Sequence, residues 1–171
     1  MPHLDAATNL ARWLMRSHAD ADDVVQEAML RAFRGFDGFR GTDVKPWLLA
    51  IVRNCHVTWI RQTRRRGHVP LPDAGEIAND DVALATNAPD PEAAAIGSDQ
   101  GQKLALAIAQ LPEEFRMVLI LRELEDMSYR EIAQVTSLPI GTVMSRLARA
   151  RALLKDKWFN QVERSARHGM S

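Results

Sequence analysis

The chain has 171 residues and 46% of them are hydrophobic, so it can bury one compact core or two small ones. No apolar run approaches the roughly 18 residues that a membrane helix needs, and the N-terminus lacks the apolar stretch of a signal peptide. The 22 basic and 22 acidic side chains cancel, so the whole chain carries no excess positive charge with which to hold a polyanion. The single cysteine, Cys55, excludes an internal disulfide and fits a reducing cytoplasm.

The charges are distributed unevenly along the chain. Residues 1–66 hold 11 Lys and Arg against 7 Asp and Glu, and residues 103–171 hold 11 against 8. Residues 67–102 hold 7 acids and neither Lys nor Arg. Two basic segments therefore flank an acidic connector, and the net charge of the whole chain says little about what each segment binds.

Three amphipathic helices are predicted in the N-terminal segment. The first, over residues 5–16, has the apolar stripe Leu10, Trp13 and Leu14. The second begins near Asp20, its expected N-cap, and has the inward stripe Val25, Met29, Ala32, Phe33 and Phe36. The third begins near Pro46, and its apolar stripe is Trp47, Leu48, Ile51, Val52, Cys55 and Trp59. It ends in the basic cluster Arg61, Arg64, Arg65 and Arg66.

Residues 67–100 of the connector contain four prolines, three glycines and few large apolar residues. It has neither a helical nor a strand period, which predicts an extended or disordered linker. Such a segment can be a plain spacer, and its lack of basic residues also suits a polyanion-like role.

Four helices are predicted in the C-terminal segment: over residues 99–110, from Pro112, over residues 128–136, and from about residue 140 onwards. The last two have the pattern of a helix-turn-helix. Ser128 and Glu131 have the spacing of a capping box, and Ser137 stands in the turn where glycine is common. The inward positions are Ile132, Val135, Leu138, Val143, Leu147 and Ala150.

The outer face of the second of these helices carries short side chains near its start and arginines further along. They are Thr142, Met144, Ser145, Arg146, Ala148 and Arg149. A helix that reads the major groove needs short side chains that can approach base edges and arginines that can reach phosphates or guanine. We therefore expect this helix to recognise duplex DNA.

The two segments resemble regions 2 and 4 of the extracytoplasmic-function group of bacterial sigma factors, the small alternative specificity subunits of RNA polymerase. The C-terminal stretch LPEEFRMVLILRELEDMSYREIAQVTSLPIGTVMSRLARARALL is similar to region 4. ADADDVVQEAMLRAF resembles region 2.2, and FRGTDVKPWLLAIVRN with RQTRRR resembles regions 2.3 and 2.4. Relatives usually have more residues ahead of ATNLARWLM. The resemblance implies an all-α fold: region 2 at residues 1–66, a flexible acidic linker at 67–98, and region 4 at 99–171.

The resemblance also implies roles for individual residues. Contacts with the polymerase are expected from Asp22, Asp23, Gln26, Glu27 and Arg31. Recognition and melting of the minus-ten element are expected from Phe39, Arg40, Asn54, Arg61, Arg64, Arg65 and Arg66. Recognition of the minus-thirty-five element is expected from Arg130, Thr142, Met144, Ser145, Arg146, Ala148, Arg149 and Arg151. Many relatives have a basic residue in place of Met144.

The partners implied by the resemblance are the β′ clamp and β flap of core RNA polymerase, promoter DNA and an anti-sigma factor. The linker is expected to run toward the RNA exit path of the polymerase. We expect a cytoplasmic protein without membrane insertion, cofactor, metal or catalytic activity of its own. His18, Cys55, His56, His68 and His168 do not have metal-ligand spacing, and Cys55 on an apolar stripe is interpreted as a packed thiol.

Two other functions fit part of the sequence. A stand-alone helix-turn-helix repressor or activator would bind operators as a dimer, but it would leave the second nucleic-acid motif of residues 20–66 without a role. A protein-binding helical adaptor would leave the arginines at residues 64–66, 146, 149 and 151 without a role.

Overall fold

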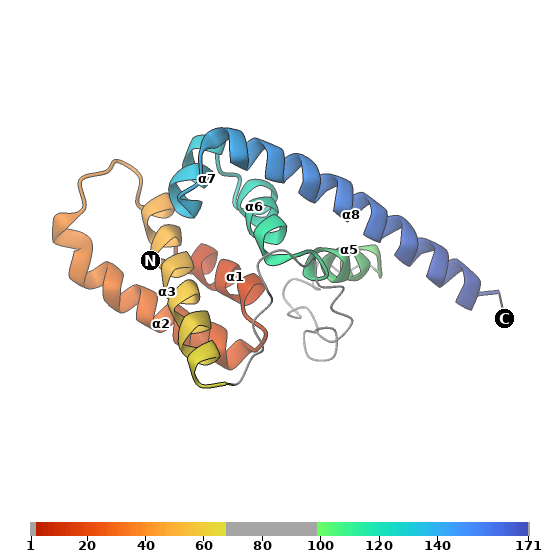
Figure 1. The fold of residues 1–171 in the computed structure, drawn as a ribbon, viewed down its shortest axis with the longest axis horizontal. Helices are drawn as coiled ribbons and strands as arrows, with labels where there is room; N and C mark the ends of the chain where they lie inside the picture. The colour runs from red at the N-terminus through yellow and green to blue at the C-terminus, as the bar shows by residue number, and fades with distance from the viewer. Residues whose placement is uncertain (1–2, 68–98, 171) are drawn as a thin grey trace. The chain divides into compact units, whose positions relative to one another are not determined.

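The computed structural model describes residues 3–67 and 99–170. Within these residues the chain forms seven α-helices and one short 3-10 helix, without a β-strand (Figure 1). The all-α fold class is therefore confirmed. The helices belong to two compact units, with α1 to α3 in the first and nearly all of α5 to α8 in the second. The predicted linker at 67–98 lies, apart from Gly67, outside the described residues.

The N-terminal unit is a three-helix domain. It consists of α1 (Leu4–Leu14), α2 (His18–Gly35), the 3-10 helix η1 (Phe36–Gly38) and α3 (Val44–Arg65). Each of the three long helices packs against the other two. Leu10 from α1 and Leu49 and Val52 from α3 are completely buried in the core. His56 is also buried, and its Nδ1 lies 3.0 Å from the sulfur of Met15.

The starts of α2 and α3 differ from the sequence prediction. The N-cap of α2 is Ser17, whose hydroxyl accepts a hydrogen bond from the Asp20 backbone N–H at 3.0 Å, so Asp20 lies inside the first turn. The N-cap of α3 is Asp43, which accepts a hydrogen bond from the Lys45 backbone N–H. Pro46 remains in the first turn, where its missing N–H costs no hydrogen bond.

Two aromatic residues that we expected on the inward, buried face of α2 are exposed. Phe33 is 83% exposed and Phe36 is 58% exposed. The inward face of α2 is made instead of smaller side chains, Ala21, Val24, Val25, Ala28 and Ala32, and Met29 is half-buried. These smaller side chains complete the inward face of α2, and Phe33 lies about 100° further around the helix than Ala32, toward solvent.

The C-terminal unit contains α5 (Asp99–Ala109), α6 (Glu113–Glu123), α7 (Tyr129–Thr136) and α8 (Ile140–His168). α6 packs against α8, and α5 packs alongside the later part of α8 (Figure 1). α8 continues as a helix through the polar sequence after Gln161 and ends at His168. None of the helices that the structure describes is long and apolar enough to cross a membrane.

Candidate nucleic-acid and partner interfaces

The helix-turn-helix of the C-terminal unit begins with the predicted capping box. The backbone N–H of Glu131 donates to the Ser128 hydroxyl at 3.1 Å, and the Glu131 carboxylate accepts from the Ser128 N–H at 2.9 Å. In the turn, Ser137 has φ of +56°, a left-handed conformation that glycine adopts more easily. The N–H of Leu138 donates to the Ala133 carbonyl at 3.2 Å and closes the turn.

The inward and outward faces of the two helices agree with the sequence prediction. Ile132, Val135, Val143, Leu147 and Ala150 are buried, and Leu138 is half-buried. The exposed residues at the start of α8 are Ile140, Gly141, Met144, Ser145, Ala148 and Arg149. Thr142 and Arg146 flank this face and are half-buried, whereas Arg130 on α7 is exposed. The surface is therefore available to a duplex.

Two of the predicted DNA-contacting arginines form ion pairs with α6. Arg151 lies 2.9 Å from the Glu123 carboxylate, and Arg146 lies 3.7 Å from that of Glu114. The hydrogen bond from Arg151 to Glu123 is the main cause that raises the pKa of the Arg151 guanidinium. Exposed pairs of this kind stabilise by about 0.2–1 kcal/mol, so they hold α8 in place weakly enough for a phosphate to compete.

In the N-terminal unit an aromatic cluster lies where the loop after α2 meets α3. The rings of Phe39 and Trp47 have centroids 4.8 Å apart, and Phe36 meets the same indole edge-on at 6.4 Å. Arg40 donates to the Asp37 carbonyl at 2.8 Å. A Cβ at Gly41 would lie 2.8 Å from the outer atoms of the Phe39 ring, so a side chain there would have to displace this ring. Trp47 and Trp59, which we expected in the core, are half-buried.

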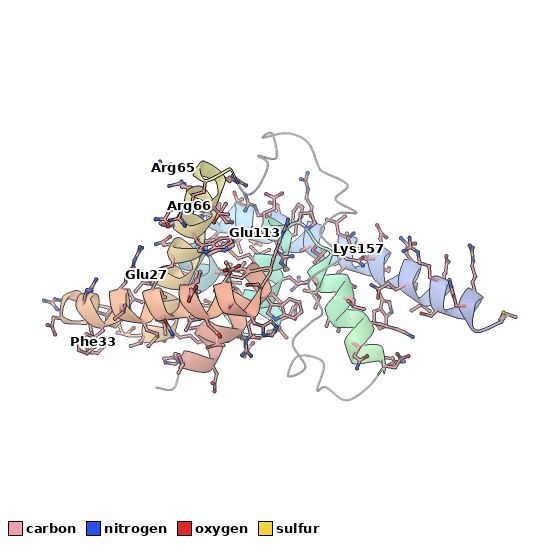
Figure 2. The ribbon with its side chains drawn as sticks, turned by 90° about the horizontal axis from the view of Figure 1, so that it is seen from below. Glu27, Phe33, Arg65, Arg66, Glu113 and Lys157 are labelled. Carbon is pink, nitrogen blue, oxygen red and sulfur yellow. The ribbon has the colours of Figure 1, made fainter. Side chains whose placement is uncertain are left out.

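A polar track continues from this cluster along α3. Trp47, Asn54 and Arg61 recur every seven residues and so share one face of the helix over about 21 Å. Asn54 is exposed, and among the described residues its side-chain oxygen accepts a long hydrogen bond, 3.4 Å, from Arg53. The track ends at Arg61, Arg64, Arg65 and Arg66, the last two of which lie together at the end of α3 (Figure 2). None of these four arginines forms an ion pair with another residue in the described ranges.

The predicted polymerase-contacting residues lie on the solvent face of α2. Asp22, Asp23, Gln26, Glu27 and Arg31 are all exposed. The Arg31 guanidinium donates to Glu27 at 2.8 Å, one helical turn away, and this hydrogen bond raises its pKa. Apolar side chains are also exposed on this helix: Leu30 is 51% exposed, and Phe33 projects outward from the later part of α2 on a different side from Glu27 (Figure 2).

Leu30 and Phe33 were missed as surface residues by sequence reasoning. The helical period placed Phe33 with the core residues because it lies at the edge of the apolar stripe. The useful signal was that Ala21, Val24, Val25, Ala28 and Ala32 already complete one inward face. Further apolar residues on the same helix must then face solvent or a partner.

A groove of about 320 Å³ lies between α2 and α3. It is lined by Asp23, Val24, Glu27, Arg31, Cys55, Thr58, Trp59 and Gln62. Cys55 is 3% exposed, which agrees with a packed thiol. Burial raises the pKa of this thiol, although the nearby Arg31 charge acts in the opposite direction. Among the described residues no group of three or more His, Cys, Asp and Glu side chains could hold a metal ion.

Two family models match this chain. Residues 1–66 match sigma-70 region 2, and residues 101–154 match sigma-70 region 4. The chain is 37% identical over 140 residues to the ECF RNA polymerase sigma-E factor of Escherichia coli strain K12, a match that covers 81% of this chain and 73% of the relative. It is 32% identical over 154 residues to the ECF RNA polymerase sigma factor SigE of Mycolicibacterium smegmatis, which covers 90% of this chain and 58% of the relative.

The fold is also similar to a solved structure. That structure is the sigma factor RpoE of Bartonella quintana in complex with the anti-sigma factor NepR. The TM-score is 0.70 at 27% sequence identity, and the match covers 90% of each chain.

Proposed function

We propose how the two units of this chain divide the task of a sigma factor. The chain belongs to the extracytoplasmic-function group of sigma-70 RNA polymerase sigma factors, which are alternative sigma factors that direct promoter-specific transcription initiation. Residues 1–66 act as region 2 and residues 99–171 as region 4. The observation that carries the proposal is the presence, in one chain, of a helix-turn-helix and of a separate unit with an aromatic and arginine track. A repressor needs only the first of these.

The outer face of α2 is our candidate for the contact with the β′ clamp of core polymerase. Its acids and Gln26 supply hydrogen-bonding groups, and Leu30 with Phe33 supplies the exposed apolar area that protein interfaces concentrate at their energetic centre. Phe33 is 83% exposed, so its ring makes few contacts within its own unit and adds little to the stability of that unit.

The face of α3 is our candidate for the melted minus-ten element. Single-stranded nucleic acid is held by aromatic surfaces and by cations along its backbone, and a flipped base needs a polar group that can bond its edge. Phe39 and Trp47 supply the aromatic surface, Asn54 the polar group, and Arg61 and the following arginines the cations. Arg40 lies in the same loop as Phe39.

The exposed start of α8 is our candidate for reading the minus-thirty-five element as duplex. Met144, Ser145, Ala148 and Arg149 have the exposure that base contact requires. Arg130 and Thr142 flank them and suit phosphate contacts, and Arg146 with Arg151 can exchange a carboxylate partner for a phosphate. We also propose that this C-terminal unit contacts the β flap of the polymerase.

We further propose that the chain works in the cytoplasm with the polymerase and that an anti-sigma factor controls it. The solved complex of RpoE with NepR supports the second point, since a chain of similar fold binds such a protein. The acidic residues 67–98 are proposed to run through a basic channel of the polymerase toward the RNA exit path. RNA synthesis itself is assigned to the polymerase, and no metal or cofactor is assigned to this chain.

The test is a pull-down with bacterial core polymerase, followed by run-off transcription on a genomic promoter library. We expect core binding and new, specific start sites. Phe33→Ala should weaken core binding at least tenfold, with Phe159→Ala on α8, also exposed, as the matched control. Arg149→Ala should reduce transcription while leaving core binding intact. Absence of core binding together with specific binding of the free chain to duplex DNA would favour a repressor instead.

A further inference from the structure

The reading face of α8 is unusually apolar where it would meet the major groove. Ile140 is 43% exposed and Met144 is 52% exposed, and Ala148 is exposed beyond them. These positions are spaced by four residues, so their side chains form one stripe along the helix. The position of Gly141 next to this stripe is open, because a Cβ there would have no neighbour within 4 Å.

The polar groups beside this stripe are partly engaged within the protein. The Ser145 hydroxyl donates to the Thr142 carbonyl at 3.0 Å, so in this arrangement its oxygen can only accept. The Arg146 guanidinium lies 3.7 Å from the Glu114 carboxylate. The cation nearest the stripe without an ion pair in the described residues is Arg149, which follows Ala148.

We propose that Met144, with Ile140 and Ala148, reads thymine methyl groups in the minus-thirty-five element. In the major groove the four base-pair orientations differ in their donors and acceptors, and only thymine adds a methyl group. An apolar stripe without donors cannot distinguish the polar edges, but it gains free energy when it covers a methyl group. This inference rests on the proposed duplex-reading role of α8 and specifies its ligand as A·T base pairs.

The thioether side chain of Met144 suits this role better than a branched residue would. It is flexible and polarisable, so it can follow the surface of a methyl group at small energetic cost. Loss of one covered methyl group should weaken binding about fourfold, which is equivalent to about 0.8 kcal/mol. An arginine at the same position would instead favour guanine, whose O6 and N7 both accept hydrogen bonds.

The test uses holoenzyme assembled from core polymerase and the full chain, on a promoter found by run-off transcription. Each thymine of its minus-thirty-five element is replaced singly by deoxyuridine, which lacks only the methyl group, and closed-complex affinity is measured. We expect a loss of about fourfold at one or two positions. Met144→Ala should abolish the loss at one of them, and Met170→Ala, at the far end of the chain and 91% exposed, should leave it unchanged.

Met144→Arg provides a second measurement that does not depend on loss of function. It should shift the preferred base at the methyl-sensitive position from thymine toward guanine on the contacted strand. Normal promoter binding without any deoxyuridine effect, or an element without thymine, would overturn the inference while leaving the proposed function intact. If Met144→Ala instead weakens core binding and not the deoxyuridine effect, the stripe is a protein contact and the inference is wrong. Failure to bind any promoter would overturn both.

Discussion

Some arginines beside the two proposed DNA-contacting surfaces differ in whether they have an acidic partner. In the C-terminal unit Arg146 and Arg151 pair with acids of α6, at 3.7 and 2.9 Å, so two cations beside the reading face have carboxylate partners before any DNA arrives. In the N-terminal unit Arg65 and Arg66 close α3 without an ion pair among the described residues. In the C-terminal unit, arginines with acidic partners border a mostly apolar surface. In the N-terminal unit, arginines without such partners concentrate positive charge at the end of α3.

This difference suits the two forms of DNA that the proposed function requires. Duplex DNA has a regular shape, so a rigid helix with positioned side chains can match it, and sequence is read through base edges. A melted strand has no fixed shape, so aromatic surfaces and unpaired cations that track its backbone serve better. The comparison predicts that salt and charge removal act more strongly on the N-terminal unit than on the C-terminal one.

The largest effect is expected from removal of charge at the end of α3. Arg65→Ala with Arg66→Ala should lower open-complex formation at least tenfold, because two phosphate contacts with a single strand are lost. The slope of log affinity against log salt concentration should fall by about 1.4, from about 0.7 for each contact. The matched control is Arg164→Ala with Arg167→Ala, which removes the same charge from the end of α8. Equal losses in both double variants would mean that only the total charge matters.

A smaller effect is expected at Asn54, whose role is confined to one base. Asn54→Ala should reduce promoter opening about tenfold, the equivalent of about 1.4 kcal/mol for a lost base contact, while closed-complex affinity stays within about twofold. Permanganate footprinting reports the opening, and gel shifts at low temperature report the closed complex. Gln62→Ala, exposed on the same helix, is the control. Normal permanganate reactivity in the Asn54 variant would remove this residue from the minus-ten site.

Much of this arrangement could be predicted from the sequence because it depends on local chemistry. The capping box at Ser128 and Glu131, the inward positions Val143 and Leu147 of α8, and the basic end of α3 are all set by residues close together in the chain. The family resemblance added the order of the two units. Its individual DNA and polymerase contacts stay predictions.

The wrong predictions each depend on geometry that the local sequence does not specify. Phe33 was assigned to the core because it lies at the edge of the apolar stripe, but smaller side chains already complete the inward face of α2 and Phe33 is 83% exposed. Asp20 was expected as the cap of α2, but Ser17 caps it, because both residue types suit that role and only backbone geometry decides between them. The ion pairs of Arg146 and Arg151 join residues about 30 positions apart, which no local pattern reveals.

The helix-turn-helix of the C-terminal unit can be destabilised locally at its capping box. Ser128→Ala removes the acceptor for the Glu131 N–H and should destabilise α7 by about 1 kcal/mol. Hydrogen exchange of the α7 amides in the full chain should then accelerate about fivefold, while exchange in α3 stays unchanged. Ser165→Ala, on the exposed later part of α8, is the control. Unchanged exchange in α7 would show that packing, and not the cap, holds the start of the helix-turn-helix.

The smallest effect is expected at Cys55, in the groove that α2 and α3 share. Burial raises the pKa of its thiol more than the Arg31 charge lowers it, so the folded chain holds this proton more tightly than the unfolded chain does. Its contribution to stability is therefore complete below the unfolded-state pKa and is lost as the pH rises through the folded-state value.

Alkylation of the native chain by iodoacetamide should begin at higher pH than alkylation of the urea-unfolded chain, and reaction at neutral pH should be slow. Arg31→Gln should move the midpoint of the native profile further upward, because the charge that favours the thiolate is gone. Arg34→Gln, on the same helix and also exposed, should leave the midpoint in place. A native midpoint below that of the unfolded chain would mean that Arg31 outweighs burial and that Cys55 is an activated thiol.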